Sequence, residues 1–147
     1  MKSLILNPAG ERVPRAWLER WLNGLSKRLA RKGFKDLQRK ELIVVFVSAR
    51  EMKRMNHFYR GKDYATDVLS FEGVEAGSVG ELILCFSTIK SQAKHTGFSE
   101  RGELGYMIIH GVLHLLGFDH ESPSEEARMF ALQDELFAGL RTRVGLR

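Results

Sequence analysis

Apolar residues along this chain recur with two different periods, which predict an alternation of helices and strands. From Pro14 to about Arg31 they recur every three or four residues, the spacing of a helix that buries one face. Leu42 to Val47 is an unbroken β-branched and aromatic run, typical of a strand buried on both faces. Three other short runs predict further strands: Ser3 to Leu6, Val68 to Phe71 and Gly80 to Phe86.

Capping residues and apolar spacing predict the remaining helices. They begin at Ser48, extend from Ser87 to about His95, and cover Leu104 to Leu116 and Pro123 to Leu140. The stretch from Leu104 to Leu116 is apolar almost all round apart from two histidines, so we expect it in the core. The predicted fold class is α+β: a small mixed β-sheet of about four strands packed with about five helices. We expect residues 1–147 to form a single domain.

The composition is that of an ordinary globular protein, with 44% apolar and 28% charged residues. Cys85 is the only cysteine, which excludes a disulfide framework and a thiolate zinc finger. The sequence contains neither a basic-then-apolar leader nor an uninterrupted apolar run of membrane-spanning length. We therefore expect a cytoplasmic protein without a membrane span.

Positive charge is concentrated in the first quarter of the chain. Residues 1–40 contain eleven Lys and Arg against three Asp and Glu, whereas the rest of the chain is slightly acidic. A patch of this kind suits a polyanion, above all nucleic acid, and Arg28 and Arg31 are candidates for such contacts. A solvated helix face accounts for the same charges equally well.

Three of the five histidines lie within the stretch from residue 110 to residue 120. His110 and His114 are four apart, so on a helix their rings project from the same face. Gly117 offers the left-handed conformation that ends helices, which lets the chain bring His120 back toward the same point. Three converging imidazoles predict a metal site with an open coordination position, usually occupied by zinc and a water. The alternative is that each histidine is an ordinary hydrogen-bonded residue.

The same histidine spacing occurs in one group of zinc proteases, in which a glutamate follows the first histidine and serves as the general base. Here that position is Gly111, so the metal ligands are kept but the peptidase base is absent. Met129 has the helical spacing of a core residue, and we do not interpret it as the methionine turn of those proteases. Metalloprotease is therefore the runner-up hypothesis.

A three-histidine site without an adjacent carboxylate can still activate water near neutral pH and polarise a phosphoryl oxygen. Cleavage of a phosphodiester also calls for a cation with forked donors, which favours arginine. Arg60 is the candidate, although a solvated surface arginine is the ordinary alternative. Asp119 either orients a histidine ring or caps the turn beside it.

The sequence resembles a known family, the bacterial YbeY-type endoribonucleases, also described as rRNA maturation factors. Two motifs carry the resemblance. The first is the whole stretch from His110 to His120, His-Gly-Val-Leu-His-Leu-Leu-Gly-Phe-Asp-His. The second is Asn-His-Phe-Tyr-Arg-Gly-Lys-Asp at residues 56–63, followed by Thr-Asp-Val-Leu-Ser-Phe at residues 66–71. The order and spacing of elements match from about Leu4 to Leu140.

The resemblance implies a zinc-dependent, single-strand-specific endoribonuclease in ribosomal RNA processing and ribosome quality control. The implied target is the 3′ end of the small-subunit rRNA, and the implied partners are the small ribosomal subunit and ribosome-associated proteins. His110, His114 and His120 match the family's metal ligands for one zinc per chain, and Arg60 matches its functional arginine. A non-catalytic ribosome-binding factor with a structural metal remains a third hypothesis.

Overall fold

The sheet has four strands, one of which runs against the other three. The computed structural model describes residues 1–60 and 68–143, apart from the side chains of residues 60, 142 and 143. The strands are β1 (Lys2–Leu6), β2 (Glu41–Phe46), β3 (Val68–Glu72) and β4 (Ser78–Leu84), in the order β1-β2-β4-β3. β1, β2 and β4 are parallel, and β3 pairs antiparallel with β4 in a hairpin. The predicted small mixed sheet is confirmed.

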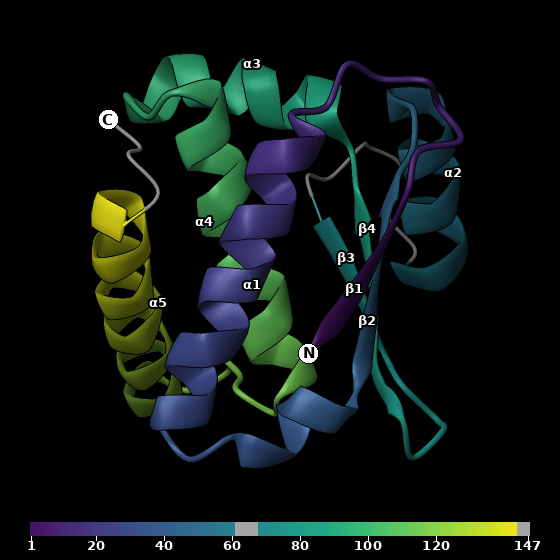
Figure 1. The fold of residues 1–147 in the computed structure, drawn as a ribbon. Helices are drawn as coiled ribbons and strands as arrows, with labels where there is room; N and C mark the ends of the chain where they lie inside the picture. Colours follow the sequence, from purple (N-terminus) through teal and green to yellow (C-terminus); the bar gives the residue numbers. More distant parts are fainter. Residues whose placement is uncertain (61–67, 144–147) are drawn as a thin grey trace.

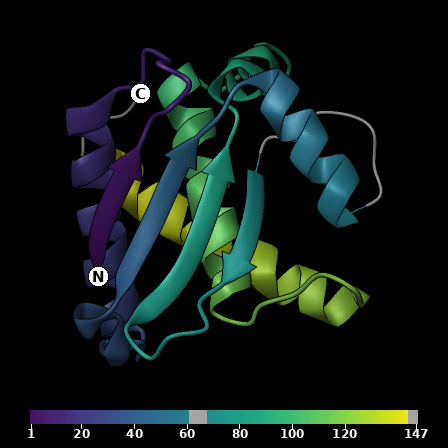
Figure 2. The ribbon, with the colours of Figure 1, turned by 90° about the vertical axis from the view of Figure 1, so that its right-hand side faces the viewer.

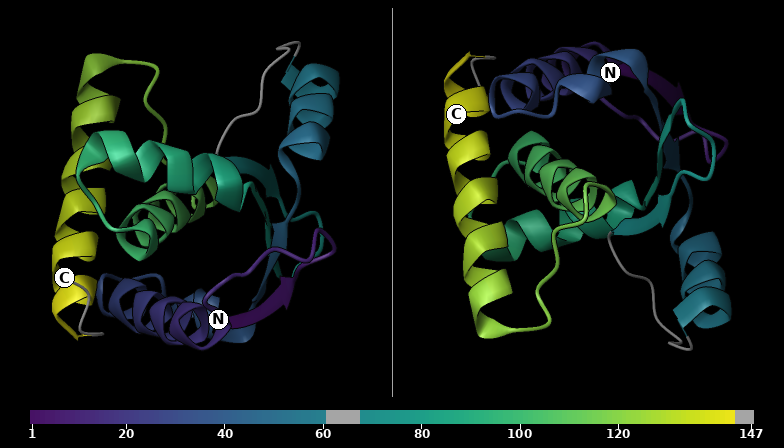
Figure 3. Two further views of the ribbon diagram at one scale, coloured as in Figure 1. Left: turned by 90° about the horizontal axis from the view of Figure 1, so that it is seen from above. Right: turned by 90° about the horizontal axis from the view of Figure 1, so that it is seen from below.

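Helices lie on both faces of the sheet, but unequally. They are α1 (Arg15–Arg31), α2 (Ala49–Arg60), α3 (Phe86–Thr96), α4 (Glu100–Leu115) and α5 (Pro123–Arg143), with a 3-10 turn η1 (Lys35–Arg39). Among the described helices, α2 covers one face, while α1 and α4 cover the other and α5 packs behind them (Figures 1 and 3). Figure 2 shows the sheet from the α2 side. The predicted α+β class with five helices is confirmed.

Alternating side chains of the strands pack into two separate apolar clusters, one on each face of the sheet. Val44 and Phe46 point into the larger cluster beneath α1 and α4. Ile83 and Leu69 belong to a smaller cluster with Met52 of α2 on the opposite face. The strand predicted to be buried on both faces is thus covered by helices on both sides. Among the described residues, no helix combines the length and apolar content needed to cross a membrane.

α1 and α4 lie on the same face of the sheet and cover different edges of it. α1 contacts β1, and α4 contacts β3 and β4. Trp21 of α1 is fully buried and donates a hydrogen bond from Nε1 to the carbonyl of Gly105 on α4 at 3.1 Å. This contact fixes α4 beside α1, so that the far side of α4 faces the β3 edge of the sheet.

Some predicted boundaries and surfaces are wrong. β4 ends at Leu84, because Phe86 is already the first residue of α3 and packs in the core. Cys85, which is buried, is the N-cap residue of α3 in place of Ser87. Arg28 does not lie on a free basic face, because its guanidinium donates to the carbonyl of Gly139 on α5 at 3.2 Å. Arg28 therefore joins two helices.

Candidate metal centre

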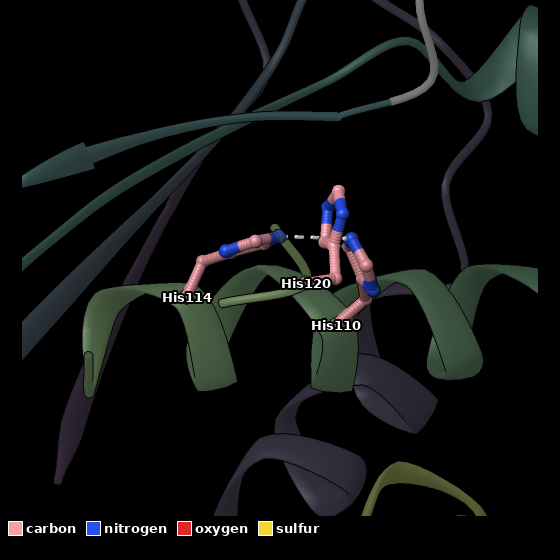
Figure 4. A group of neighbouring side chains, drawn as sticks. All are labelled: His110, His114 and His120. Atoms are coloured by element: carbon pink, nitrogen blue, oxygen red, sulfur yellow. Dashed lines mark hydrogen bonds between the residues drawn. The ribbon is translucent and has the colours of Figure 1, made fainter. Parts of the chain in front are cut away.

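Two elements carry the histidine cluster: α4 and the turn that follows it. His110 and His114 lie one turn apart on α4, and His120 follows the helix end (Figure 4). Gly117 adopts the left-handed conformation, with φ of 97°, as predicted. The amides of Gly117 and Phe118 donate to the carbonyls of the last helical turn, which reverses the chain and returns His120 toward α4.

The structure brings the three imidazoles together. The ring centroid of His114 lies 4.6 Å from that of His110 and 5.1 Å from that of His120. One nitrogen from each ring lies within 4.8 Å of the others, a group that could hold a metal ion. His110 and His114 are half-buried, whereas His120 is exposed. Metal ligation by these residues remains a prediction, and the geometry it requires is in place.

Each of the two helical rings is held through its Nδ1 atom. His114 Nδ1 lies 3.1 Å from the carbonyl oxygen of Phe118, which can only accept, so Nδ1 carries the proton. His110 Nδ1 lies 3.1 Å from Oε1 of Gln133, a buried residue of α5. The amide of Gln133 is oriented in turn, because its Nε2 donates to the carbonyl of Tyr106 at 3.4 Å. Both Nε2 atoms are therefore left without a proton.

The Nε2 atoms of these two rings face each other. His110 Nε2 and His114 Nε2 are 3.1 Å apart, the contact drawn as a dashed line in Figure 4. Two lone pairs repel at this distance unless a proton or a metal ion lies between them. Two nitrogen ligands of one tetrahedral zinc are separated by about 3.3 Å, given bonds of about 2.0–2.1 Å. The donor set and its spacing fit a bound zinc ion.

The environment of His114 favours the neutral ring that a metal needs. Burial and the neighbouring imidazoles of His110 and His120 lower the pKa of His114 below its ordinary value of 6.5. At neutral pH the ring is therefore uncharged, and metal binding does not have to displace a proton. The burial of the ring on an apolar helix thus keeps it in the neutral form that can bind a metal ion.

Asp119 and Gly111 have structural roles at this site. Asp119 Oδ1 accepts from the backbone N–H of His120 at 2.7 Å, so it caps the turn, the second of its two predicted roles. A Cβ on Gly111 would lie 2.7 Å from Cδ2 of Leu82 and 3.3 Å from Oγ of Ser70. Position 111 therefore faces the sheet, and a glutamate there would clash with Leu82 of β4.

Arg60, the predicted phosphate-binding residue, is the last residue of α2. Its side chain lies outside the described part of the structure, as do Thr66 and Asp67 of the second motif. The role assigned to Arg60 therefore stays a prediction. α2 itself places its C-terminal end near the β3 edge of the sheet, on the face opposite α4 (Figure 3).

A cleft of about 650 Å³ opens beside the histidines. One wall is formed by α4 and its following turn, including all three histidines, and the other by Tyr59 and every residue of β3. β3 is an edge strand in the described sheet, so its outer backbone groups face this cleft. In Figure 4, β3 passes opposite the imidazole rings. The cluster therefore faces a space large enough for more than a phosphate group.

Two residues of the site did not emerge from the sequence. Gln133 lies four residues after Met129, within the inner apolar stripe of α5, and a polar residue there was the available signal. Tyr59 lies within the second motif, but only the fold places the end of α2 beside β3. Sequence spacing in α4 and the turn after it predicted the histidine cluster, but not the residues contributed by other elements.

Comparison with known proteins gives a consistent result. A family model described as Endoribonuclease YbeY matches residues 8–141. A protein of Bdellovibrio bacteriovorus named Endoribonuclease YbeY is 42% identical over 150 residues, covering 100% of both chains. One of the same name from Limosilactobacillus reuteri is 40% identical over 116 residues, covering 67% of this chain and 73% of its own. A solution structure from Thermotoga maritima, 30% identical, matches with a TM-score of 0.69 over 96% of this chain and 90% of its own.

Proposed function

The chain belongs to the endoribonuclease YbeY family, and from this premise we propose that it is a zinc-dependent hydrolase specific for single-stranded RNA. We propose further that its substrate is ribosomal RNA in the small subunit, processed at the 3′ end and monitored during ribosome quality control. The cytoplasm, where ribosomes are assembled, is the compartment that this role requires. The single observation that carries the proposal is the pair of Nε2 atoms of His110 and His114 that face each other across 3.1 Å beside an open cleft.

The chain's own residues divide the work as follows. His110, His114 and His120 would hold the zinc, with Gln133 and the carbonyl of Phe118 keeping two of the rings in the required tautomer. Zinc, when bound, supplies a water of lowered pKa and polarises a phosphoryl oxygen. The guanidinium of Arg60 binds the charged phosphate and stabilises the negative charge that develops during cleavage.

The alternative hypotheses are less well supported. A metalloprotease of the related histidine spacing needs a carboxylate after the first ligand, and position 111 packs against β4 with no room for one. A non-catalytic ribosome-binding factor needs only a closed structural site. Here the cluster borders a cleft of about 650 Å³, which supports access by a substrate.

The test is a cleavage assay on identically purified proteins. Metal-free protein is expected to be inactive on single-stranded RNA, to recover with one equivalent of zinc, and to leave duplex RNA and casein intact. Arg60→Ala should lower the rate at least about 100-fold. Arg50→Ala, an exposed arginine in the first turn of the same helix, is the matched control. Arg60→Ala with the wild-type rate, or zinc-restored protein that digests casein and not RNA, would contradict the proposal.

The ribosomal part of the proposal needs its own substrate. Precursor small subunits with an unprocessed rRNA 3′ end are expected to be shortened by zinc-loaded protein and to remain unchanged with His114→Ala. Cleavage of free single-stranded RNA without any shortening of these precursors would leave an endoribonuclease but remove the assignment to rRNA maturation.

A further inference from the structure

An exposed aromatic ring stands on the wall of the cleft that faces the histidines. Tyr59, near the C-terminal end of α2, is 58% exposed and lines the cleft together with β3. Its ring makes an edge contact with Phe71 of β3, with centroids 5.1 Å apart and planes at 70°. Phe71 is itself packed against the small apolar cluster under α2. The tyrosine ring is therefore held in position from behind while much of its surface stays open.

The described residues of the wall around Tyr59 offer few other means of binding a nucleic acid. Among the described residues that line the cleft none is Lys or Arg, and Glu72 and Asp119 are acidic. Charge on this described lining therefore does not explain how RNA would be held beyond the phosphate at the metal. An aromatic face and the outer backbone edge of β3 are what the wall presents instead.

Unpaired bases are recognised in proteins mainly by stacking on aromatic rings. We propose that Tyr59, supported by Phe71, is a stacking site for a base of single-stranded RNA next to the phosphodiester at the histidine cluster. This inference rests on the proposed endoribonuclease function and adds the part of the substrate recognised. A base within a duplex is already stacked and paired, so it cannot occupy this site without being extruded. Tyr59 thus gives a physical reason for preference for unpaired RNA.

Neighbouring apolar residues provide a contrast. Phe58 is 75% exposed on the same helix and touches the ring of Tyr59, but it does not line the cleft. Val74, in the turn between β3 and β4, is 99% exposed and also lies outside the cleft lining. Exposure alone therefore does not identify a stacking site. Tyr59 is singled out because it lines the same cleft as the histidines.

The experiment combines a change in the protein with a change in the RNA. A labelled single-stranded oligonucleotide is prepared with one abasic nucleotide at each position in turn, and kcat and KM are measured. Tyr59→Leu should raise KM about 5- to 100-fold for the intact RNA, the size of one lost stack, with a smaller change in kcat. Tyr59→Trp, which keeps a larger ring, should restore tight binding. Phe58→Leu is the matched control, expected to change KM less than about twofold because it leaves the stacking ring in place.

The abasic series tests the contact itself. At one position, removal of the base should raise the KM of the wild type by the same factor and have no further effect on Tyr59→Leu. An equal loss at that position in both proteins would overturn the proposal, and so would an unchanged KM in Tyr59→Leu. If Tyr59→Leu does not fold, Tyr59→Trp provides the test. Its larger ring should stack more strongly, so removal of the base at that one position should raise KM by a larger factor than in the wild type. An identical factor in the two proteins would contradict the proposal.

Failure of the proposed function is distinguishable from failure of this inference. Fluorescence anisotropy of the same RNA on His114→Ala measures binding without cleavage. Stacking that depends on Tyr59 in a wild-type protein that never cleaves RNA would contradict the enzyme assignment and keep the binding site. Cleavage of RNA with no dependence on Tyr59 would keep the enzyme assignment and contradict the stacking site. Zinc content measured on every variant shows whether the metal centre is intact in each case.

Discussion

The two walls of the cleft are built in opposite ways. On the α4 wall, His110 and His114 are half-buried, and each ring is held by a second group, Gln133 or the carbonyl of Phe118. On the β3 wall, Tyr59 is largely exposed and β3 is an edge strand of the described sheet. The proposed metal chemistry, which needs fixed ligands, belongs to the rigid wall, and the proposed contacts to an RNA chain belong to the open one. Changes to the two walls should therefore have different consequences: metal affinity on one side, substrate affinity on the other.

On the rigid wall, the largest effect of changing a residue other than a proposed ligand is expected from Gln133→Leu. Loss of the amide frees the ring of His110 to rotate and to take up the other tautomer, so the dissociation constant for zinc should rise about 10- to 100-fold. Gln133→Glu supplies a charged acceptor at the same place and should keep tight binding. Gln92→Leu, at an exposed position of α3, is the control. Zinc titration with a competing chelator measures all three, and wild-type affinity in Gln133→Leu would show that the ring needs no such support.

The distance between the two walls depends on Gly111. An added methyl group would lie 2.7 Å from Cδ2 of the fully buried Leu82, so packed atoms would have to shift. Gly111→Ala should therefore lower the free energy of unfolding by about 1–3 kcal/mol and weaken zinc binding as α4 shifts. Gly77→Ala, where an added Cβ meets nothing within 4 Å, should have little effect. Urea unfolding of the metal-free proteins makes the comparison, and equal midpoints for the two variants would contradict the packing argument.

A smaller effect is expected from pH, again on the rigid wall. His114 has a pKa lowered by burial, whereas the ring in the unfolded chain titrates near 6.5. Above that pH both states are neutral and His114 contributes no pH dependence. As pH falls below about 6.5 the unfolded chain takes up a proton first, so the metal-free fold should lose stability until the folded ring also titrates. NMR titration of the metal-free protein should place the His114 midpoint below 6.5, and a midpoint at or above this value would contradict the account.

The smallest effect is expected outside both walls, on α1. Lys27 and Arg31 are exposed, but α1 covers the β1 end of the sheet, far along it from the cleft. Charge reversal of both should change the cleavage rate of a short oligonucleotide less than about twofold at moderate salt. For long RNA, any contact with this face would appear as a salt dependence of binding flatter by about one unit per lost phosphate contact. A large loss on the short RNA would place α1 within the substrate site.

Local patterns in the sequence predicted most of the elements and the histidine cluster, because both depend on spacing within one segment. His110 and His114 share a face by helical periodicity, and Gly117 reverses the chain as glycine can. The end of β4 was misplaced because Phe86 continues the apolar run while already belonging to α3. An apolar run indicates only that its residues are buried. Where a buried strand is followed directly by a buried helix, the run continues across the boundary and does not show where the strand ends.

Contacts between distant elements were beyond the reach of those patterns. Gln133 reaches His110 only through the register of α5 against α4, and Tyr59 reaches β3 only through the path of α2. Arg28 has the spacing of a surface residue, yet the close approach of α5 at Gly139 gives its guanidinium a carbonyl to bind. In each case the missing information is the relative placement of two helices or of a helix and a strand, which tertiary packing decides.

The most direct test of the metal centre is calorimetric titration of zinc into metal-free protein. The account predicts one zinc per chain for the wild type and for His95→Ala, whose exposed ring lies near the end of α3. For His114→Ala it predicts an affinity at least about 100-fold weaker, because loss of a ligand must exceed the loss of a supporting residue. His114→Ala that binds one zinc as tightly as the wild type would contradict the three-histidine centre.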